Sequence, residues 1–193
     1  MDSFRQAFLI TAYKDPVQLM RLIEKAKDFY IYVHVDKNCI QAFGKVIKAY
    51  EENPRVTIVS RYHVSWGSYN HLQSVVYLMN LARNNPHIKY VHVLSGQDYP
   101  ICSLRNGFLQ FEDMKTIYMT CRWLFDTNDN VVRRYERLHL LAPILDMRSD
   151  MYNKLDKYFS FGKKRIGGVE IKDLYKGMIL ASMPMEVCRY VCM

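Results

Sequence analysis

Three residues that could form part of a functional site, Ser95, Gly96 and Asp98, lie in a short turn that follows the apolar run 90–94. The run is rich in β-branched and aromatic residues, which predicts a buried strand. Ligands of open α/β sheets bind outside the carboxyl ends of the strands, so Asp98 is placed to meet a ligand. The same residues, with Pro100, also fit a tight turn that has no ligand.

A second carboxylate, Asp36, follows the apolar run 29–35. It could contact a ligand at the same edge of the sheet, or it could cap the segment that follows Lys37. His34 and Asp36 have a His-x-Asp spacing, but no third metal ligand accompanies them, so His34 is interpreted as a core histidine.

The composition limits the function classes. The chain has 193 residues, of which 50% are hydrophobic, and a net charge of +8 with a pI near 9.2, which favours anionic partners. No nucleic-acid-binding motif is present. The five cysteines have no zinc-site spacing and indicate a reducing compartment. The sequence predicts one domain, 1–193, with no signal peptide or membrane span, and a cytoplasmic protein that charge could hold at a membrane surface.

Hydrophobic periodicity predicts an order of elements that begins strand, helix, strand, helix, strand. Asp15 and Pro16 are suited to start the first helix, and Ser68 is suited to cap a later one. This order favours an α/β fold, with a mostly parallel sheet and helices on both faces. The predicted strands are 7–13, 29–35, 56–59, 90–94 and 116–120, and the predicted helices include one after Pro184.

With these segments in place, the chain resembles the core-2/I-branching enzyme family of glycosyltransferases in its bacterial form. The likeness covers nearly the whole chain and is fairly specific when its motifs are taken together. It is carried by AFLITAYKDPVQLMRLI (7–23), IYVHVDK (31–37), VSWGSYNHLQSVVYLMNLA (64–82), VHVLSGQDYPI (91–101), RRYERLH (133–139) and LYKG (174–177).

The resemblance implies a GT-A type, Rossmann-like fold and transfer of a sugar with inversion at its anomeric carbon. The donor would be UDP-N-acetylglucosamine, or UDP-xylose in the xylosyltransferase branch, and the acceptor a glycan. No divalent metal cofactor is implied. Most GT-A enzymes hold a metal with an Asp-x-Asp pair, whereas the matching turn here has Asp98 alone, and one carboxylate is a poor cage for Mg²⁺ or Mn²⁺.

Residue roles also follow from the resemblance. Asp36 would meet the nucleoside, although a capping role stays open, and Trp66 and Gly67 form either a phosphate-binding turn or a core turn. Arg133, Arg134 and Glu136 would contact the acceptor, with a solvated helix face as the alternative. The full donor-binding set is Ala12, Tyr13, Asp36, Trp66, Gly67, Ser95, Gly96 and Asp98.

The sequence names no catalytic residue. The resemblance places the base, a glutamate, beyond Met193. The sequence stops in the middle of a predicted helical pattern, so a C-terminal truncation is predicted. A non-catalytic nucleotide-sugar binding module or inactive fragment is therefore the alternative function. Many relatives carry an aromatic residue after the position of Gly177, where this chain has Met178.

Overall fold

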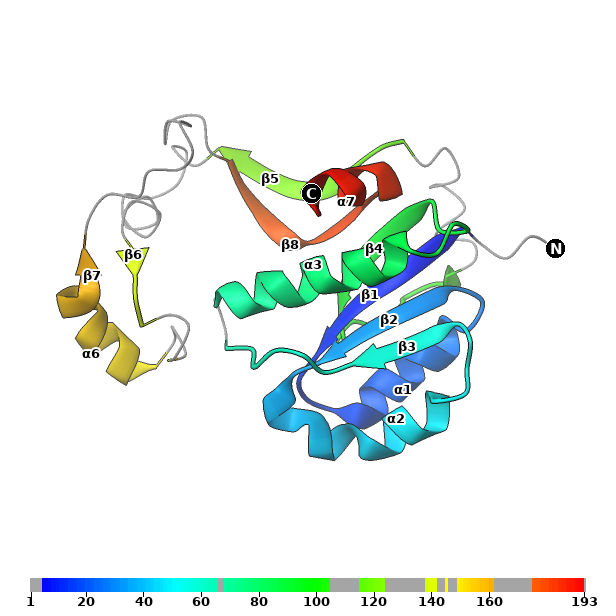
Figure 1. Ribbon diagram of the computed structural model, residues 1–193, viewed down its shortest axis with the longest axis horizontal. Coiled ribbons are helices and arrows are strands. Elements are labelled where there is room, and N and C mark those ends of the chain that lie inside the picture. The colour runs from blue at the N-terminus through cyan, green and yellow to red at the C-terminus, as the bar shows by residue number, and fades with distance from the viewer. Residues whose placement is uncertain are drawn as a thin grey trace. The chain divides into compact units, whose positions relative to one another are not determined.

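Figure 1 shows the computed structural model, which describes residues 5–65, 68–104, 115–123, 138–141, 145, 149–161 and 175–192. The chain divides into two compact units. Unit 1 comprises residues 1–64, 72–118 and 179–193, and unit 2 comprises residues 65–71 and 119–178. The prediction of a single domain stays a prediction.

The helices and strands follow in the order β1 (Gln6–Ala12), α1 (Pro16–Lys25), β2 (Tyr30–Val35), the 3-10 helix η1 (Lys37–Phe43), α2 (Gly44–Tyr50), β3 (Val56–Val59), α3 (Tyr69–Arg83), β4 (Tyr90–Ser95), β5 (Tyr118–Trp123), β6 (Leu138–His139), α6 (Asp150–Phe159), β7 (Ser160–Phe161), β8 (Tyr175–Pro184) and α7 (Met185–Val191).

Parallel pairing dominates the main sheet, whose strand order is β3-β2-β1-β4-β8-β5. β1 pairs in parallel with both β2 and β4, and β2 pairs in parallel with β3. β8 is antiparallel to β4. The four parallel strands therefore end at one edge of unit 1, with helical connections between them, as is usual for parallel pairing.

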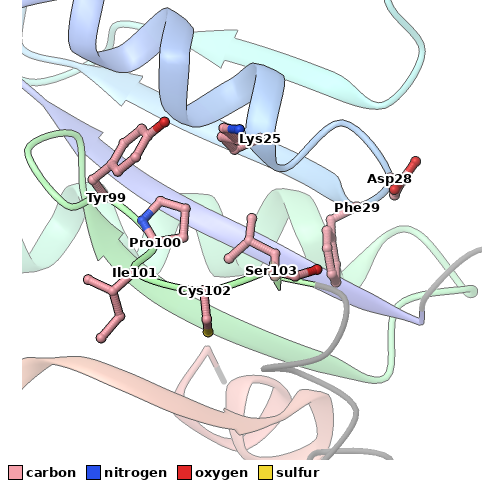
Figure 2. A pocket seen from close by; sticks show the side chains of 9 residues that line it. Lys25, Asp28, Phe29, Tyr99, Pro100, Ile101, Cys102 and Ser103 are labelled. Carbon is pink, nitrogen blue, oxygen red and sulfur yellow. The ribbon is translucent and has the colours of Figure 1, made fainter.

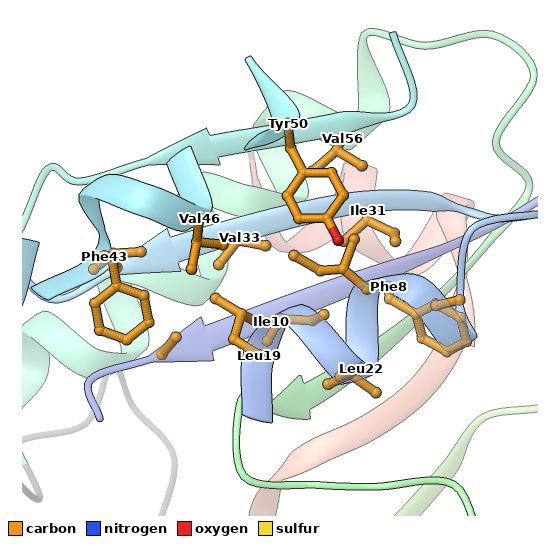
Figure 3. Close-up of a cluster of buried hydrophobic side chains, with 14 of the residues drawn as sticks. Phe8, Ile10, Leu19, Leu22, Ile31, Val33, Phe43, Val46, Tyr50 and Val56 are labelled. Carbon is orange, nitrogen blue, oxygen red and sulfur yellow. The ribbon is translucent and has the colours of Figure 1, made fainter. Parts of the chain in front are cut away.

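The core on one face of the parallel strands lies under α1 and α2 (Figures 1 and 3). Phe8 and Ile10 of β1 point to this face, where they meet Leu19 and Leu22 of α1 and Phe43 before α2. Asp15 starts α1 as predicted, because its carboxylate accepts a hydrogen bond from the backbone N–H of Gln18 at 2.9 Å.

The opposite face carries a second core against α3 and α7. Ala7 and Leu9 alternate with the residues of the first core along β1 and face this side, where Leu78 of α3 and Cys188 of α7 are fully buried. Both faces of the strands are thus covered by helices. The structure confirms the predicted α/β fold, with a mostly parallel sheet and helices on both faces.

Near the C-terminal end of the sequence, the structure adds one element to those predicted. Residues Tyr175–Pro184 form β8, a strand that the sequence did not predict. The predicted helix after Pro184 is confirmed as α7.

All five cysteines are free thiols. Cys188 is buried beneath α3. This burial, and to a smaller extent the charge interaction with Cys192, raises the pKa of its thiol to about 12. Cys188 is therefore a small core residue. Within the described part of the chain, no helix is long and apolar enough to cross a membrane.

Candidate functional site

The register of the parallel strands brings the predicted donor-binding residues to one edge of unit 1. Ala12 at the end of β1 pairs with Val35, the residue before Asp36. On the other side of β1, Thr11 pairs with Ser95 at the end of β4. The backbone N–H of Asp36 then donates to the carbonyl of Ala12 at 2.9 Å. The carboxyl ends of β2, β1 and β4 thus lie side by side.

Asp36 is held rigidly at this edge. Its Oδ1 accepts hydrogen bonds from the backbone N–H groups of Asn38 and Val64, both at 3.0 Å. The first bond is the cap of η1, so the capping role that the sequence left open is real. Among the described residues Oδ2 receives no hydrogen bond, and the side chain as a whole is 6% exposed. One carboxylate oxygen therefore builds the fold, and the other has no hydrogen-bond partner within the described part of the chain.

The chain that leaves β3, Ser60–Val64, is here called the exit segment. It has no regular secondary structure, but it is bonded to the turn after β2. Besides the bond from Val64 to Asp36, the N–H of Lys37 donates to the carbonyl of Tyr62 at 3.1 Å. His63 Nδ1 lies 2.9 Å from Oδ1 of Asn38. The exit segment and the turn after β2 therefore form a continuous surface at the carboxyl edge.

The turn after β4 is closed by its own side chains. Oδ2 of Asp98 accepts a hydrogen bond from the N–H of Ser95 at 2.8 Å, and the Ser95 hydroxyl accepts one from the N–H of Gln97 at 3.2 Å. The turn is tied to β1 and α1 as well, because the N–H of Gly96 donates to the carbonyl of Thr11 at 2.9 Å and Gln18 Nε2 donates to the carbonyl of Asp98 at 3.2 Å. The tight turn that the sequence offered as an alternative is thus present, and a ligand role for Asp98 would be additional to it.

The backbone of Gly96 is not in the left-handed region that favours glycine, so packing is the reason for a glycine at this position. A Cβ atom at this position would lie 3.0 Å from Cβ of Ala12 and 3.5 Å from the carbonyl oxygen of Thr11. The turn after β4 therefore lies directly against the end of β1. Close contact between these two chain segments is the physical reason for a glycine at this position.

Several predicted site residues can now be placed. The structure brings together Ala12, Tyr13, Asp36, Ser95, Gly96 and Asp98. Tyr13 is 50% exposed, with Lys14 Nζ 5.3 Å from the centre of its ring. Ala12 is buried, so its side chain shapes the edge and is not open to a ligand. The predicted residues outside the described part of the chain are Trp66, Gly67, Arg133, Arg134 and Glu136.

Metal ligands are not grouped in the described ranges: no set of three His, Cys, Asp or Glu side chains there could hold an ion. In unit 2, His139 and Asp156 form a pair with Nδ1 and Oδ1 at 2.9 Å. A pair of two side chains supplies fewer ligands than a metal site needs. The expectation of a metal-independent reaction stays a prediction.

A surface pocket of about 410 Å³ lies elsewhere in unit 1 (Figure 2). It is formed by the end of α1, the start of β2 and the chain that runs back after the β4 turn. It extends from Tyr99, the residue after Asp98, to Asp28 and Phe29 before β2. The lining residues are Lys25, Asp28, Phe29, Tyr99, Pro100, Ile101, Cys102, Ser103 and Leu104.

Sequence reasoning missed the exit segment and the part played by His34. Oδ1 of Asp36 and Nε2 of His34 both bond to backbone N–H groups of this segment. The available signal was the spacing of two residues between His34, near the end of β2, and Asp36, just after it. This spacing places their side chains on the same side of the strand. The partner, a loop with no motif of its own, gave no signal.

Comparisons with solved structures give distant likenesses. A Bacillus anthracis protein described as a glucose-1-phosphate thymidylyltransferase, in complex with a sucrose, shares 10% identity at a TM-score of 0.46, over 96% of this chain and 74% of that one. The apo form of mouse xyloside xylosyltransferase 1 shares 10% identity at a TM-score of 0.39, over 95% and 69%. No match to the sequence was found among curated proteins.

The family model of the core-2/I-branching enzymes matches residues 6–154. The match contains β1 to β4, the turn after β2, the exit segment and the turn after β4, which are the parts that build the carboxyl edge. The chain belongs to the core-2/I-branching enzyme family and is a glycosyltransferase.

Proposed function

We propose that this glycosyltransferase moves N-acetylglucosamine from UDP-N-acetylglucosamine to a glycan acceptor, with inversion and without a divalent metal. The observation that carries the proposal is the arrangement of two carboxylates at the carboxyl edge. One oxygen of Asp36 accepts two backbone hydrogen bonds and the other is left over, whereas Asp98 closes its own turn with one oxygen and has no second carboxylate beside it in the turn 95–98. The first suits recognition of a nucleoside, and the second is poorly suited to hold a metal.

Nucleoside recognition is assigned to Asp36. A carboxylate whose Oδ1 already accepts two backbone hydrogen bonds cannot rotate freely, so its Oδ2 has a fixed direction. An acceptor of this kind selects a ligand N–H or O–H, which a uracil ring and a ribose both offer. Because the group is nearly buried, its bond to a ligand would be shielded from water and hence stronger than an exposed one.

Metal-free neutralisation of the diphosphate is supported by the charge and by the state of Asp98. The chain has an excess of basic residues, with a net charge of +8. A metal-binding carboxylate needs free lone pairs in company with other oxygen ligands. Asp98 has one oxygen bonded to Ser95, and the turn 95–98 offers no second carboxylate. In the proposed reaction, basic side chains take the place of the cation.

The chemical step is a single displacement. The acceptor hydroxyl oxygen attacks the anomeric carbon from the face opposite the leaving group, and the new glycosidic bond forms as the bond from this carbon to the phosphate oxygen breaks. The electron pair of the broken bond leaves with UDP, and a carboxylate takes the hydroxyl proton as general base. Arg133, Arg134 and Glu136 are proposed to orient the acceptor through charge-assisted hydrogen bonds to its hydroxyls.

The test is a turnover assay that reports each part of the proposal separately. UDP release is measured with UDP-N-acetylglucosamine, UDP-xylose and UDP-glucose, with a panel of glycan acceptors, and with or without EDTA. We expect acceptor-dependent release that is fastest with UDP-N-acetylglucosamine and unchanged by EDTA, and a β-linked product by NMR. Preference for UDP-xylose would replace the donor, loss of release in EDTA would overturn the metal-free reaction, and an α-linked product would overturn inversion.

A further inference from the structure

We propose that His34 is a positioning residue, which holds the exit segment Ser60–Val64 in the shape that completes the donor site. The identity of the ligand in this inference rests on the proposed function. The attachment of the exit segment to His34 rests on the contacts of the His34 side chain.

The contact that carries the inference joins the imidazole to two successive backbone amides. Nε2 of His34 lies 3.2 Å from the backbone nitrogen of Arg61 and 3.1 Å from that of Tyr62, and both N–H groups donate to it. A ring nitrogen that accepts hydrogen bonds carries no proton, so the neutral ring holds its proton on Nδ1. The side chain is only 1% exposed, which shields both bonds from water.

Ring packing reinforces this attachment. The ring of Tyr62 stacks on that of His34, with centroids 5.7 Å apart and planes 27° apart. On its other side, Tyr62 meets Tyr77 of α3 edge to face at 6.2 Å, and the Arg61 guanidinium lies 4.8 Å from the centre of the Tyr77 ring. The first residues of the exit segment are thus fixed between β2 and α3.

His34 and Asp36 together hold both ends of the exit segment. His34 accepts from Arg61 and Tyr62 near its start, and Asp36 accepts from Val64 at its end. Without an acceptor at the position of Nε2, two adjacent amides lose their partner in a partly buried place, which is costly unless the segment moves to reach water. Movement would carry Val64 away from Asp36 and disturb the surface that the donor meets.

A second buried histidine provides a matched control. His92 of β4 is also 1% exposed, and its ring bonds to the side chains of Ser182 and Gln6, at 2.8 and 2.9 Å. Neither partner belongs to the exit segment or to the carboxyl edge. Loss of His92 therefore damages the same sheet without releasing the segment.

The experiment compares three variants with the wild-type protein: His34→Leu, His34→Gln and His92→Leu. Leucine fills the volume without an acceptor, whereas the glutamine amide oxygen can replace Nε2. Hydrogen exchange of the Arg61 and Tyr62 amides reports the segment directly, and titration with UDP reports the site. We expect His34→Leu to speed exchange of both amides at least tenfold and to weaken UDP binding at least tenfold. In His34→Gln both quantities should return to within about threefold of wild type.

For His92→Leu, we expect a lower melting temperature but no selective change in the exchange of Arg61 and Tyr62 and no more than a twofold change in UDP affinity. The inference is overturned if His34→Leu leaves the exchange of these amides unchanged, or if His92→Leu weakens UDP binding equally. If the wild-type protein does not bind UDP, the proposed function fails and takes the donor role of the segment with it. The exchange result would then still decide whether His34 holds the segment.

Discussion

The backbone N–H of Val64 donates to Oδ1 of Asp36 at 3.0 Å and joins residues 28 positions apart in the chain. The carboxylate that ends β2 and the segment that leaves β3 therefore act as one structural unit. Oδ1 of Asp36 accepts the two backbone hydrogen bonds that stabilise the fold. The proposed contact with the donor is therefore assigned to Oδ2. This division makes the two roles separable by mutation.

Asp36→Asn and Asp36→Ala should separate the two roles. Asparagine keeps a side-chain oxygen for Asn38 and Val64, so we expect a loss of at most about 1 kcal/mol in the free energy of unfolding, together with at least tenfold weaker UDP binding. Alanine leaves both N–H groups without their acceptor and should cost about 2–4 kcal/mol. Urea unfolding and UDP titration measure these effects. Wild-type affinity in Asp36→Asn would remove Asp36 from the donor site.

Asp98→Asn tests the turn after β4. The amide oxygen can still accept from the N–H of Ser95, so the fold should survive, while UDP release from the sugar donor should fall by about an order of magnitude or more because a charge near the reacting groups is lost. Asp15→Asn is the matched control, since Asp15 also accepts from a backbone N–H and has no assigned ligand role. Equal activity in the two variants would show that Asp98 only closes the turn.

Gly96→Ala should destabilise the protein by about 1–3 kcal/mol, because the added methyl group meets Ala12 and the backbone of Thr11. The control is Gly44→Ala at the start of α2, where a Cβ atom meets nothing within 4 Å. There we expect no loss of stability, and a gain of up to about 1 kcal/mol, because alanine favours the helix and restricts the unfolded chain. Equal effects of the two substitutions on the melting temperature would refute the packing account.

Protonation of His92 in the unfolded chain should lower the free energy of unfolding as the pH falls below neutral. Burial lowers its pKa from 6.5 to about 3 in the folded state. Between these values the unfolded chain binds a proton that the folded chain does not, so stability is complete above pH 6.5 and falls as the pH decreases. The loss at pH 5.5 is about 1.4 kcal/mol. Comparison of urea unfolding at pH 7.5 and 5.5 should show that the decrease in His92→Gln is smaller by this amount. An equal decrease in both proteins would place the titration elsewhere.

Local patterns in the sequence were enough to predict the parallel half of the fold. The strand 56–59 has the predicted bounds, and α1 begins after Asp15 as expected, because apolar periodicity and helix caps act between near neighbours. β8 was missed because its partner β4 lies about ninety residues earlier, with Tyr90 opposite Pro184, so no local pattern announces the pairing.

For the site, the sequence predicted the residues but not the bonds among them. Asp36 and Asp98 were identified by their position after buried strands, and the register places both at the carboxyl edge. What could not be predicted is that the backbone of the exit segment supplies donors to His34 and Asp36, since any residue type can offer an N–H group. The packing of Gly96 against Ala12 could not be predicted either, because close contact between segments depends on the tertiary structure.

The most direct test of the central claim is a calorimetric titration that measures the binding of UDP-N-acetylglucosamine to the wild-type protein and to Asp36→Asn in the presence of EDTA. The account predicts that the wild-type protein binds the donor without a metal and that Asp36→Asn, although folded, binds it at least tenfold more weakly. Binding that appears only when Mg²⁺ or Mn²⁺ is added would contradict the metal-free site, and equal binding by both proteins would contradict the assignment of the nucleoside to Asp36.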